Sequence, residues 1–322
     1  MQSIPIIDIS ECSSSGEARR AIARRIDRAC RDVGFFYVRG HGVDERVISS
    51  LQAAVVELFE LPWPVKQVLS VEPGNYRGYI PFAAFGDNVS VVDVDHYEGY
   101  KLHREVTADD PIRKECRLYA PNRWPEGLPG FRETVLDYWR ELDTLSGQLL
   151  RLFALALGLE ETHFLSSFMD SLTNMTLLHY PRMERAKAGS GIHPHRDIDA
   201  FTILHPGEVP GLEVLNHDQD WVPVDPLEGT LVVNLGIILE LWSGGRVVST
   251  PHRTTNPSAT DRYSFPYFAT PRYNVLIEPL LDRLPGFDRP AVEAGVILSE
   301  LFRTNWKTEA QTDPAVDVGE VG

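Results

Sequence analysis

Three residues in the second half of the chain have the types and the order of a metal-binding triad. His195 and Asp197 stand two positions apart. On an extended strand such residues point to the same side, so an imidazole nitrogen and a carboxylate oxygen can reach one ion. His252 follows a predicted turn and strand and is the best candidate for a third ligand. Two imidazoles and one carboxylate leave coordination positions open, which is the ligand set of non-haem Fe(II) oxygenases.

The tripeptide His-x-Asp/Glu alone is weak evidence for a site. It occurs three times, and ten histidines multiplied by the acidic frequency of 46/322 predict about 1.4 occurrences by chance. Zinc hydrolases also use two histidines and a carboxylate, but the chain lacks the sequence His-Glu-x-x-His. His193 is an alternative to His195, although only His195 has an aspartate two positions later. The surrounding sequence must therefore decide the assignment.

Arg262 and Ser264 form a second pair, ten positions beyond His252 and on an apparent strand. A guanidinium group within an apolar run needs an anion, and a bidentate carboxylate with a serine hydroxyl beside it meets that need. A salt bridge to a nearby acidic residue of the chain is the alternative. The pair therefore indicates a carboxylate-binding site, with that alternative open.

The elements expected around these residues form a mixed α and β fold. Helical spacing of apolar residues alternates with two short strands in the first 160 residues, and β-rich runs separated by Gly, Pro, Asn and Asp fill the part from Met175 onward. Such spacing suits a barrel or jelly roll flanked by helices. The expected helices cover 22–33, 47–59, 131–157 and 294–306, and the expected strands cover 4–7, 34–38, 176–180, 201–205, 212–215, 230–235, 246–249, 263–269 and 275–277.

Composition and charge limit the partners of the chain. Its 31 basic and 46 acidic residues give a net charge of −15, which argues against nucleic acid as a partner. The longest apolar run, 230–242, is too short to span a membrane, and the N-terminus does not resemble a signal peptide. Three cysteines without a C-x-x-C pair fit a reducing compartment. We therefore expect a cytoplasmic protein, a monomer or weak homo-oligomer that binds a small molecule and neither nucleic acid nor membrane.

Taken in order, the candidate residues resemble the iron(II) and 2-oxoglutarate-dependent dioxygenases related to isopenicillin N synthase. The resemblance covers nearly the whole chain, because further motifs occur in the family's order and spacing. These motifs include Ile4-Pro5-Ile6-Ile7-Asp8, Gly34-Phe35-Phe36-Tyr37-Val38, Arg77-Gly78-Tyr79, Glu98-Gly99-Tyr100, Tyr180-Pro181, Thr202, Gly211-Leu212-x-Val214, Asn234-Leu235-Gly236 and Pro251-His252-Arg253.

The resemblance implies a double-stranded β-helix core, a ligand set and a reaction. His195, Asp197 and His252 would hold Fe(II), and Arg262 with Ser264 would hold the distal carboxylate of the cosubstrate 2-oxoglutarate. Tyr180 matches a family tyrosine that often touches this cosubstrate, although a buried tyrosine with a satisfied hydroxyl explains it equally well. With O2, such an enzyme oxidises an unactivated C–H bond of a small molecule. Hydroxylation is the first expectation, with desaturation, cyclisation and epoxidation as other outcomes, in bacterial secondary metabolism.

The chain is expected to be a single catalytic unit over residues 1–322. An N-terminal α/β region at 1–130 precedes a long helix and connector at 131–174. The β-helix core with the metal site would occupy 175–280, and a C-terminal helix with an acidic tail would occupy 281–322.

The sequence departs from the usual family pattern in ways that affect the substrate. Arg196 replaces a common Thr, Asp199 a frequent Gly and Ile237 a common Asp, while Leu178 replaces an Asn of many plant members and predicts a drier cosubstrate pocket. By motif order, four cations lie near the substrate entrance, where they would pair with an acidic or polar small molecule; a solvated charged loop is the alternative. These cations are Arg196, Lys101, His103 and Arg104.

Two other functions remain open from the sequence. The same triad can serve an oxidase that uses no 2-oxoglutarate, with Arg262 and Ser264 binding a substrate carboxylate. The chain could also be a catalytically silent small-molecule-binding protein on this fold.

In a molecule of charge −15, capture of a dianionic cosubstrate needs a locally positive electrostatic potential, which iron and Arg262 would supply.

Overall fold

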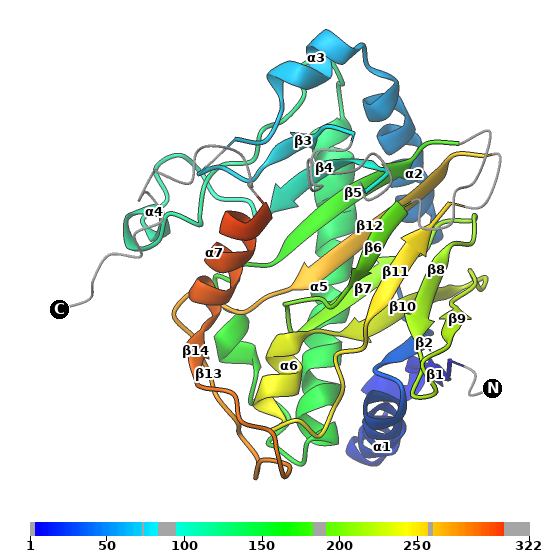
Figure 1. The fold of residues 1–322 in the computed structure, drawn as a ribbon, viewed down its shortest axis with the longest axis vertical. Helices are drawn as coiled ribbons and strands as arrows, with labels where there is room; N and C mark the ends of the chain where they lie inside the picture. The colour runs from blue at the N-terminus through cyan, green and yellow to red at the C-terminus, as the bar shows by residue number, and fades with distance from the viewer. Residues whose placement is uncertain (1–3, 73, 83–94, 183–190, 257–259, 306–322) are drawn as a thin grey trace.

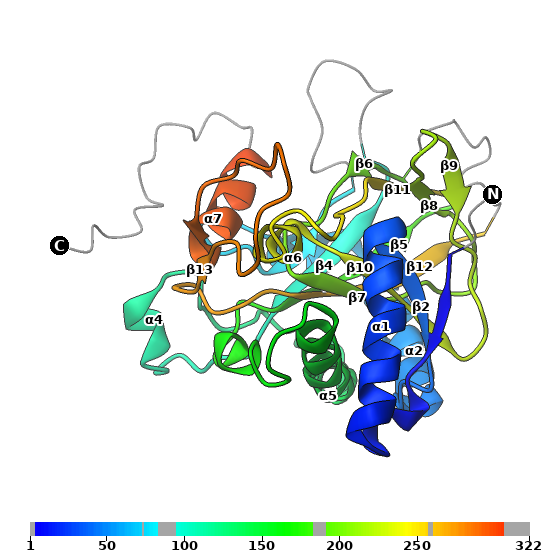
Figure 2. The same cartoon turned by 90° about the horizontal axis from the view of Figure 1, so that it is seen from below.

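Two β-sheets face each other, and helices cover the outer face of the larger one (Figures 1 and 2). The computed structural model describes residues 4–72, 74–82, 95–182, 191–256 and 260–305. The large sheet has the strand order β1-β2-β10-β7-β12-β5-β4-β3, and the small sheet has the order β6-β11-β8-β9. A separate pair joins β13 and β14.

The bounds of the elements are as follows. The large sheet contains β1 (Ile6–Asp8), β2 (Phe35–Arg39), β3 (Gly78–Ile80), β4 (Glu98–His103), β5 (Asn174–Tyr180), β7 (Phe201–His205), β10 (Thr230–Leu235) and β12 (Arg262–Ala269). The other strands are β6 (Gly191–His195), β8 (Leu212–Leu215), β9 (Trp221–Pro223), β11 (His252–Thr255), β13 (Leu276–Ile277) and β14 (Val292–Glu293). The helices are α1 (Gly16–Asp32), α2 (Glu45–Glu60), α3 (Trp63–Val68), α4 (Ile112–Glu115), α5 (Phe131–Ala156), α6 (Ile237–Trp242) and α7 (Ala294–Asn305), with short 3-10 turns at Ser10–Ser13 and Leu165–Phe168.

The long helix α5 supports the large sheet from behind (Figure 2). Val135, Leu142 and Leu149 recur every seven residues, so they lie on one face of the helix, and all three are fully buried. The helices α1 and α2 pack against α5. Side-chain oxygens cap the N-termini of both helices. Ser15 accepts a hydrogen bond from the Ala18 amide, and Asp44 accepts one from the Arg46 amide.

This architecture confirms the predicted fold class, a jelly-roll core with N-terminal and flanking helices. Strands from the first 130 residues belong to the same sheet as the later ones, because β2 pairs with β10 and β4 pairs with β5. The expectation of a single catalytic unit over residues 1–322 stays a prediction. No helix of the described residues is both long enough and apolar enough to cross a membrane.

Several sequence expectations differ from the structure. Residues 246–249 form no strand, since Gly244 and Gly245 have positive φ and the chain turns until β11 begins at His252. Strand β6 ends at His195, the first expected ligand, so Asp197 lies just after this strand rather than within it. The polar strand β4 was not among the expected strands. The acidic tail predicted at 307–322 lies outside the described residues.

Gly34 lets strand β2 approach the segment that leads to His252. Its φ is +72°, and a Cβ at this position would lie 2.2 Å from the carbonyl oxygen of Val248. Beside it, the Thr250 hydroxyl donates a hydrogen bond of 2.5 Å to the Val33 carbonyl. The ring of Phe35, the next residue, packs edge-on against the His252 imidazole with centroids 5.4 Å apart. Gly34 therefore fixes the place of a predicted metal ligand.

Gly34→Ala should destabilise the fold far more than Gly158→Ala. Both glycines have positive φ, but a Cβ at Gly158 meets nothing within 4 Å. The control should therefore cost about 1–2 kcal/mol from backbone strain, whereas the clash raises the cost of Gly34→Ala to about 3 kcal/mol or more. Chemical denaturation of both variants measures this difference. Equal losses would show that the close approach to Val248 is unimportant.

Candidate active site

His195, Asp197 and His252 converge at one end of the small sheet. Each offers one ligand atom, and these atoms all lie within 4.8 Å of one another. The Asp197 Oδ1 atom is 3.7 Å from Nε2 of His195 and 3.6 Å from Nε2 of His252. Because β11 pairs with β6, His252 stands directly opposite His195. Donor atoms bound to one ion at about 2.1 Å and at right angles are about 3 Å apart, so a small inward movement suffices to close this triad on an ion.

Backbone carbonyls orient both imidazoles. His195 Nδ1 lies 2.8 Å from the His193 carbonyl oxygen, and His252 Nδ1 lies 3.2 Å from that of Thr250. A carbonyl only accepts, so each Nδ1 must carry the proton and each Nε2 keeps its lone pair facing Asp197. Burial lowers the pKa of His252 to about 4, against the opposing charge of Asp197. The ring is therefore neutral at neutral pH, as a metal ligand must be.

Two hydrogen bonds hold the other oxygen of the Asp197 carboxylate. Its Oδ2 atom accepts from the Thr202 hydroxyl at 2.5 Å and from the Asn234 amide at 2.6 Å. Burial alone would raise the pKa of Asp197, but the two imidazoles and these hydrogen bonds hold it below its usual range. The carboxylate is therefore ionised, with Oδ1 left to face the histidines.

Arg262 is a buried cation that faces the same cavity. It is 1% exposed, and no carboxylate of the described residues lies within salt-bridge distance of it. Its guanidinium lies 3.5 Å from the Ser264 hydroxyl and 4.8 Å from the ring centre of Tyr180, the residue directly opposite it on β5. The salt bridge considered as an alternative from the sequence is thus not formed there. A buried guanidinium of this kind fits a carboxylate ligand.

The triad and the arginine line one cavity between the sheets. Apolar side chains also line this cavity, and Leu178, which replaces the family asparagine, is one of them. The full lining comprises Leu178, Tyr180, Ile192, His195, Asp197, Thr202, Leu204, Leu212, Asn234, His252, Thr254, Arg262, Ser264, Pro266 and Phe268.

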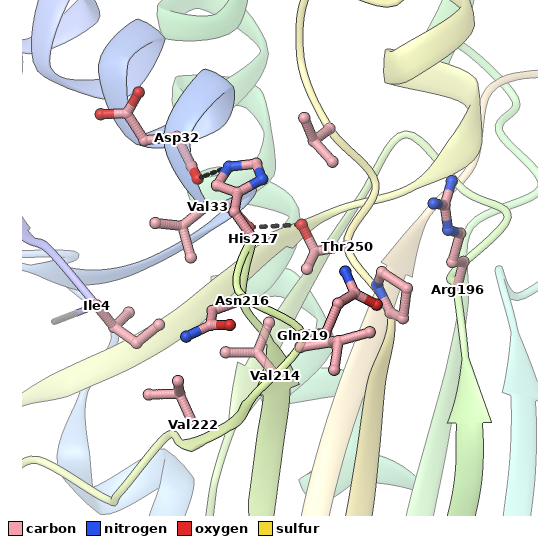
Figure 3. Close-up of a pocket in the computed structure, with 13 residues that line it drawn as sticks. Ile4, Asp32, Val33, Arg196, Val214, Asn216, His217, Gln219, Val222 and Thr250 are labelled. Carbon is pink, nitrogen blue, oxygen red and sulfur yellow. Dashed lines mark hydrogen bonds between the residues drawn. The ribbon is translucent and has the colours of Figure 1, made fainter. Parts of the chain in front are cut away.

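The four cations that were expected at the substrate entrance lie in different parts of the structure. Lys101 and His103 lie on β4 and are buried. Arg104 forms a salt bridge of 2.8 Å with Asp170 and is not brought into the cavity. Arg196 lines a different cavity and stands 3.6 Å from Glu240 (Figure 3). A substrate contact by Arg104 or Arg196 therefore stays a prediction without support from this geometry.

The second cavity has a volume of about 240 Å³ and lies beside the β8–β9 hairpin. Figure 3 shows His217 of this hairpin hydrogen-bonded to the Asp32 carbonyl, with Arg196 at the far side.

His193, the alternative first ligand, is turned away from the triad, because its Nδ1 atom lies 2.6 Å from Oδ1 of Asp95.

Sequence reasoning assigned no role to several residues of the site. Thr202 and Asn234 were named only as positions of family motifs. Those motifs were nevertheless the sequence signal for the two residues that donate hydrogen bonds to Asp197. Asp199, 1% exposed, was noted only as a replacement for glycine. Burial and the charge of Asp197 raise its pKa well above the usual value. Phe268 carries no sequence signal, since its place follows from cross-strand register alone.

Comparisons with known proteins agree with this geometry. Residues 4–127 match the family described as the N-terminal region of the non-haem dioxygenase in morphine synthesis, and residues 172–271 match the 2OG-Fe(II) oxygenase superfamily. The second match spans the whole of the triad and the Arg262-x-Ser264 pair.

Relatives and solved structures cover nearly the whole chain. A homoarginine-6-hydroxylase of Arabidopsis thaliana is 31% identical over 87% of this chain and 88% of its own. A 2-oxoglutarate-Fe(II) type oxidoreductase of Emericella nidulans is 31% identical over 82% of this chain and 78% of its own. A 2OG-Fe(II) oxygenase family protein of Caulobacter crescentus has a TM-score of 0.81 at 26% identity, covering 94% of this chain and 99% of that one. The rice dioxygenase for auxin oxidation has a TM-score of 0.73 at 28% identity, covering 94% and 96%. The chain therefore belongs to the iron(II) and 2-oxoglutarate-dependent dioxygenases of the isopenicillin N synthase-like family.

Proposed function

We propose that His195, Asp197 and His252 bind the Fe(II) of this dioxygenase and that Arg262, Ser264 and Tyr180 bind 2-oxoglutarate. One observation carries the proposal. A set of two histidines and one carboxylate and a buried arginine without a carboxylate partner among the described residues line one cavity. The donor set suits Fe(II), and the arginine suits the far carboxylate of a dicarboxylic acid.

The bound iron and 2-oxoglutarate, with O2, supply the oxidising power to break a C–H bond, and 2-oxoglutarate leaves as succinate and CO2. The chain's own residues prepare the site. The Nε2 atoms of His195 and His252 and the Oδ1 atom of Asp197 would hold the ion. Arg262 and Ser264 would orient the cosubstrate, and apolar lining side chains such as Leu178 would limit the access of water.

We further propose that the substrate is a small molecule and that hydroxylation of an unactivated C–H bond is the reaction, in bacterial secondary metabolism. Similarity to a homoarginine hydroxylase and to an auxin-oxidising dioxygenase supports a small substrate. The cavity lies between the sheets and is narrow, which also favours a small molecule over a polymer.

The reaction can be tested by O2 uptake with a library of small metabolites. We expect substrate-triggered O2 uptake that requires both Fe(II) and 2-oxoglutarate and yields one succinate per O2. A His252→Ala variant should lose this activity. Substrate-dependent uptake that continues without 2-oxoglutarate would contradict the assignment of Arg262 to the cosubstrate. It would favour the oxidase that the sequence left open.

Thr202→Val should weaken metal binding without unfolding the protein. The variant removes one of the two hydrogen bonds to Asp197 Oδ2 and leaves the ligand itself in place. Loss of such a partner typically costs 10- to 100-fold in metal affinity. Calorimetric titration with Mn(II) measures this effect, and Thr144→Val on the exposed face of α5 makes the same atomic change as a control. Unchanged affinity in Thr202→Val would count against Asp197 as a ligand.

Arg262→Met should raise the KM for 2-oxoglutarate and leave Mn(II) affinity unchanged. A hydrogen-bonded contact with a charged group contributes about 1.5–3 kcal/mol, so we expect roughly a 10- to 100-fold increase in KM. Arg253→Met is the matched control, because Arg253 lies on β11 but pairs with Glu213 and covers Trp221. Equal effects of the two substitutions on KM would exclude a specific role for Arg262.

A further inference from the structure

We infer that the substrate is a small carboxylic acid and that the Lys101 ammonium binds its carboxylate. This inference rests on the proposed function, because the bound acid would be the substrate of the same metal site. It names a specificity residue and a substrate class, and it assigns Lys101 no part in the chemical step.

The large sheet places Lys101 on its inner face. Lys101 pairs with Thr176 across β4 and β5. Because the residue is only 9% exposed, water does little to solvate the charge on its Nζ atom. The side chain crosses β5, donates a hydrogen bond of 3.0 Å to the Thr176 hydroxyl, and ends 4.7 Å from the ring centre of Phe268 on β12. Phe268 lines the cavity of the triad. The ammonium group therefore lies at the margin of that cavity.

Two buried lysines of this fold differ in how their charge is compensated. Lys66 donates to Glu98 at 2.8 Å and to the Phe59 carbonyl at 2.8 Å, so its charge is paired within the protein. Lys101 has the Thr176 hydroxyl and aromatic rings, and no carboxylate of the described residues lies within salt-bridge distance. Buried charges are normally paired. Lys66 is therefore structural, whereas Lys101 has the environment of a cation that awaits an anion.

Other polar atoms beside Lys101 also lack partners. The Nδ1 atom of His103, 3% exposed, makes no hydrogen bond, while its Nε2 atom faces the Tyr76 carbonyl at 3.1 Å. The Oδ1 atom of Asp199 likewise makes none. Burial, and then the charges of Arg77 and Lys101, lower the pKa of His103 well below its usual value, so this ring is neutral. Buried polar groups are seldom left unsatisfied unless a ligand or water completes them, so the surroundings of Lys101 suit a further polar group.

The ligand that fits Lys101 is a monoanion with two acceptor oxygens. The ammonium carries three donors, and Thr176 uses one of them. A carboxylate presents two oxygens to the remaining donors, whereas a phosphate dianion would need further cations. Burial lowers the pKa of Lys101 to about 7, against the opposing charges of Asp199 and Asp197. A bound carboxylate would restore the charged form of the lysine.

The register also says where the rest of the substrate lies. Phe268 pairs with Thr202 on the neighbouring strand, and Thr202 donates to Asp197. Adjacent strands are about 4.8 Å apart, so a molecule held at Lys101 crosses the Phe268 ring before it reaches the triad. The substrate should therefore have an apolar body between its carboxylate and the carbon that is oxidised.

Matched pairs of small molecules test this inference. The enzyme loaded with Mn(II) and 2-oxoglutarate is titrated by calorimetry with aryl- and cycloalkyl-substituted acetic and propionic acids, and with the primary amides of the same acids. The Fe(II) enzyme is assayed with both sets for succinate formation. We expect the acids to bind roughly 10- to 100-fold more tightly than their amides and to trigger more succinate. Amides or phosphate esters that bind as well as the acids would overturn the inference.

Substitutions then assign the preference to one side chain. Lys101→Met should abolish the difference between acid and amide, and Thr176→Val, a milder change that removes only the orienting hydroxyl, should reduce it several-fold. Lys114→Met, on the exposed α4, is the matched control and should preserve it. A full acid preference in Lys101→Met, or in Thr176→Val if the first variant does not fold, contradicts the role of Lys101.

The two levels of the proposal fail in different ways. If wild-type protein with Mn(II) does not bind 2-oxoglutarate, the proposed function fails. If it binds 2-oxoglutarate normally but shows no preference for acids, only the Lys101 inference fails. If Lys101→Met weakens 2-oxoglutarate binding itself, Lys101 serves the cosubstrate and the inference is wrong.

Discussion

The buried carboxylate of Asp197 is the group on which the rest of the site depends. An isolated charge at this depth is costly, so it persists only with hydrogen bonds and opposite charges around it. Thr202 and Asn234 satisfy one oxygen, and these two residues stand opposite each other on the adjacent strands β7 and β10. A one-residue slip between these strands would turn one of them away from the carboxylate. The ionised state of Asp197 therefore depends on the register between β7 and β10.

The ligands and their supports come from opposite sheets. Both histidines belong to the small sheet, while Thr202, Asn234 and Arg262 belong to the large one. The site therefore exists only where the two sheets face each other, and the contact of Phe35 with His252 helps to fix that distance. The helices behind the large sheet have no ligand to contribute, but their buried faces hold the sheet in place.

Charge within the molecule is arranged against its overall sign. The chain carries a net charge of −15, yet Arg262 in the lining of the cavity and Lys101 beside Phe268 of that lining are both buried. Neither has a carboxylate at salt-bridge distance among the described residues. A metal ion held by the triad would add further positive charge to this region. Such a local reversal attracts a dicarboxylate at one end and, as we propose, a carboxylic acid at the other.

Local sequence patterns predicted the parts of the site that lie close together along the chain. The strands 201–205, 212–215 and 230–235 have the predicted bounds, because apolar β-branched residues filled them and turn residues ended them. The strand β4 was missed because it contains Glu98, Lys101 and His103, which are polar yet buried. The direction of Arg196 and the unpaired state of Lys101 depend on cross-strand neighbours far away in sequence, so no local pattern could predict them. Motif order, rather than secondary structure, indicated the triad; its three side chains lie together, and their role as metal ligands stays a prediction.

A crystal structure with Mn(II) and 2-oxoglutarate, located by the anomalous signal of the metal, tests the central claim most directly. The account predicts one ion bonded to Nε2 of His195, Nε2 of His252 and Oδ1 of Asp197, with the far carboxylate of 2-oxoglutarate on Arg262. An ion bound to His193, or one that leaves Asp197 uncoordinated, would contradict it.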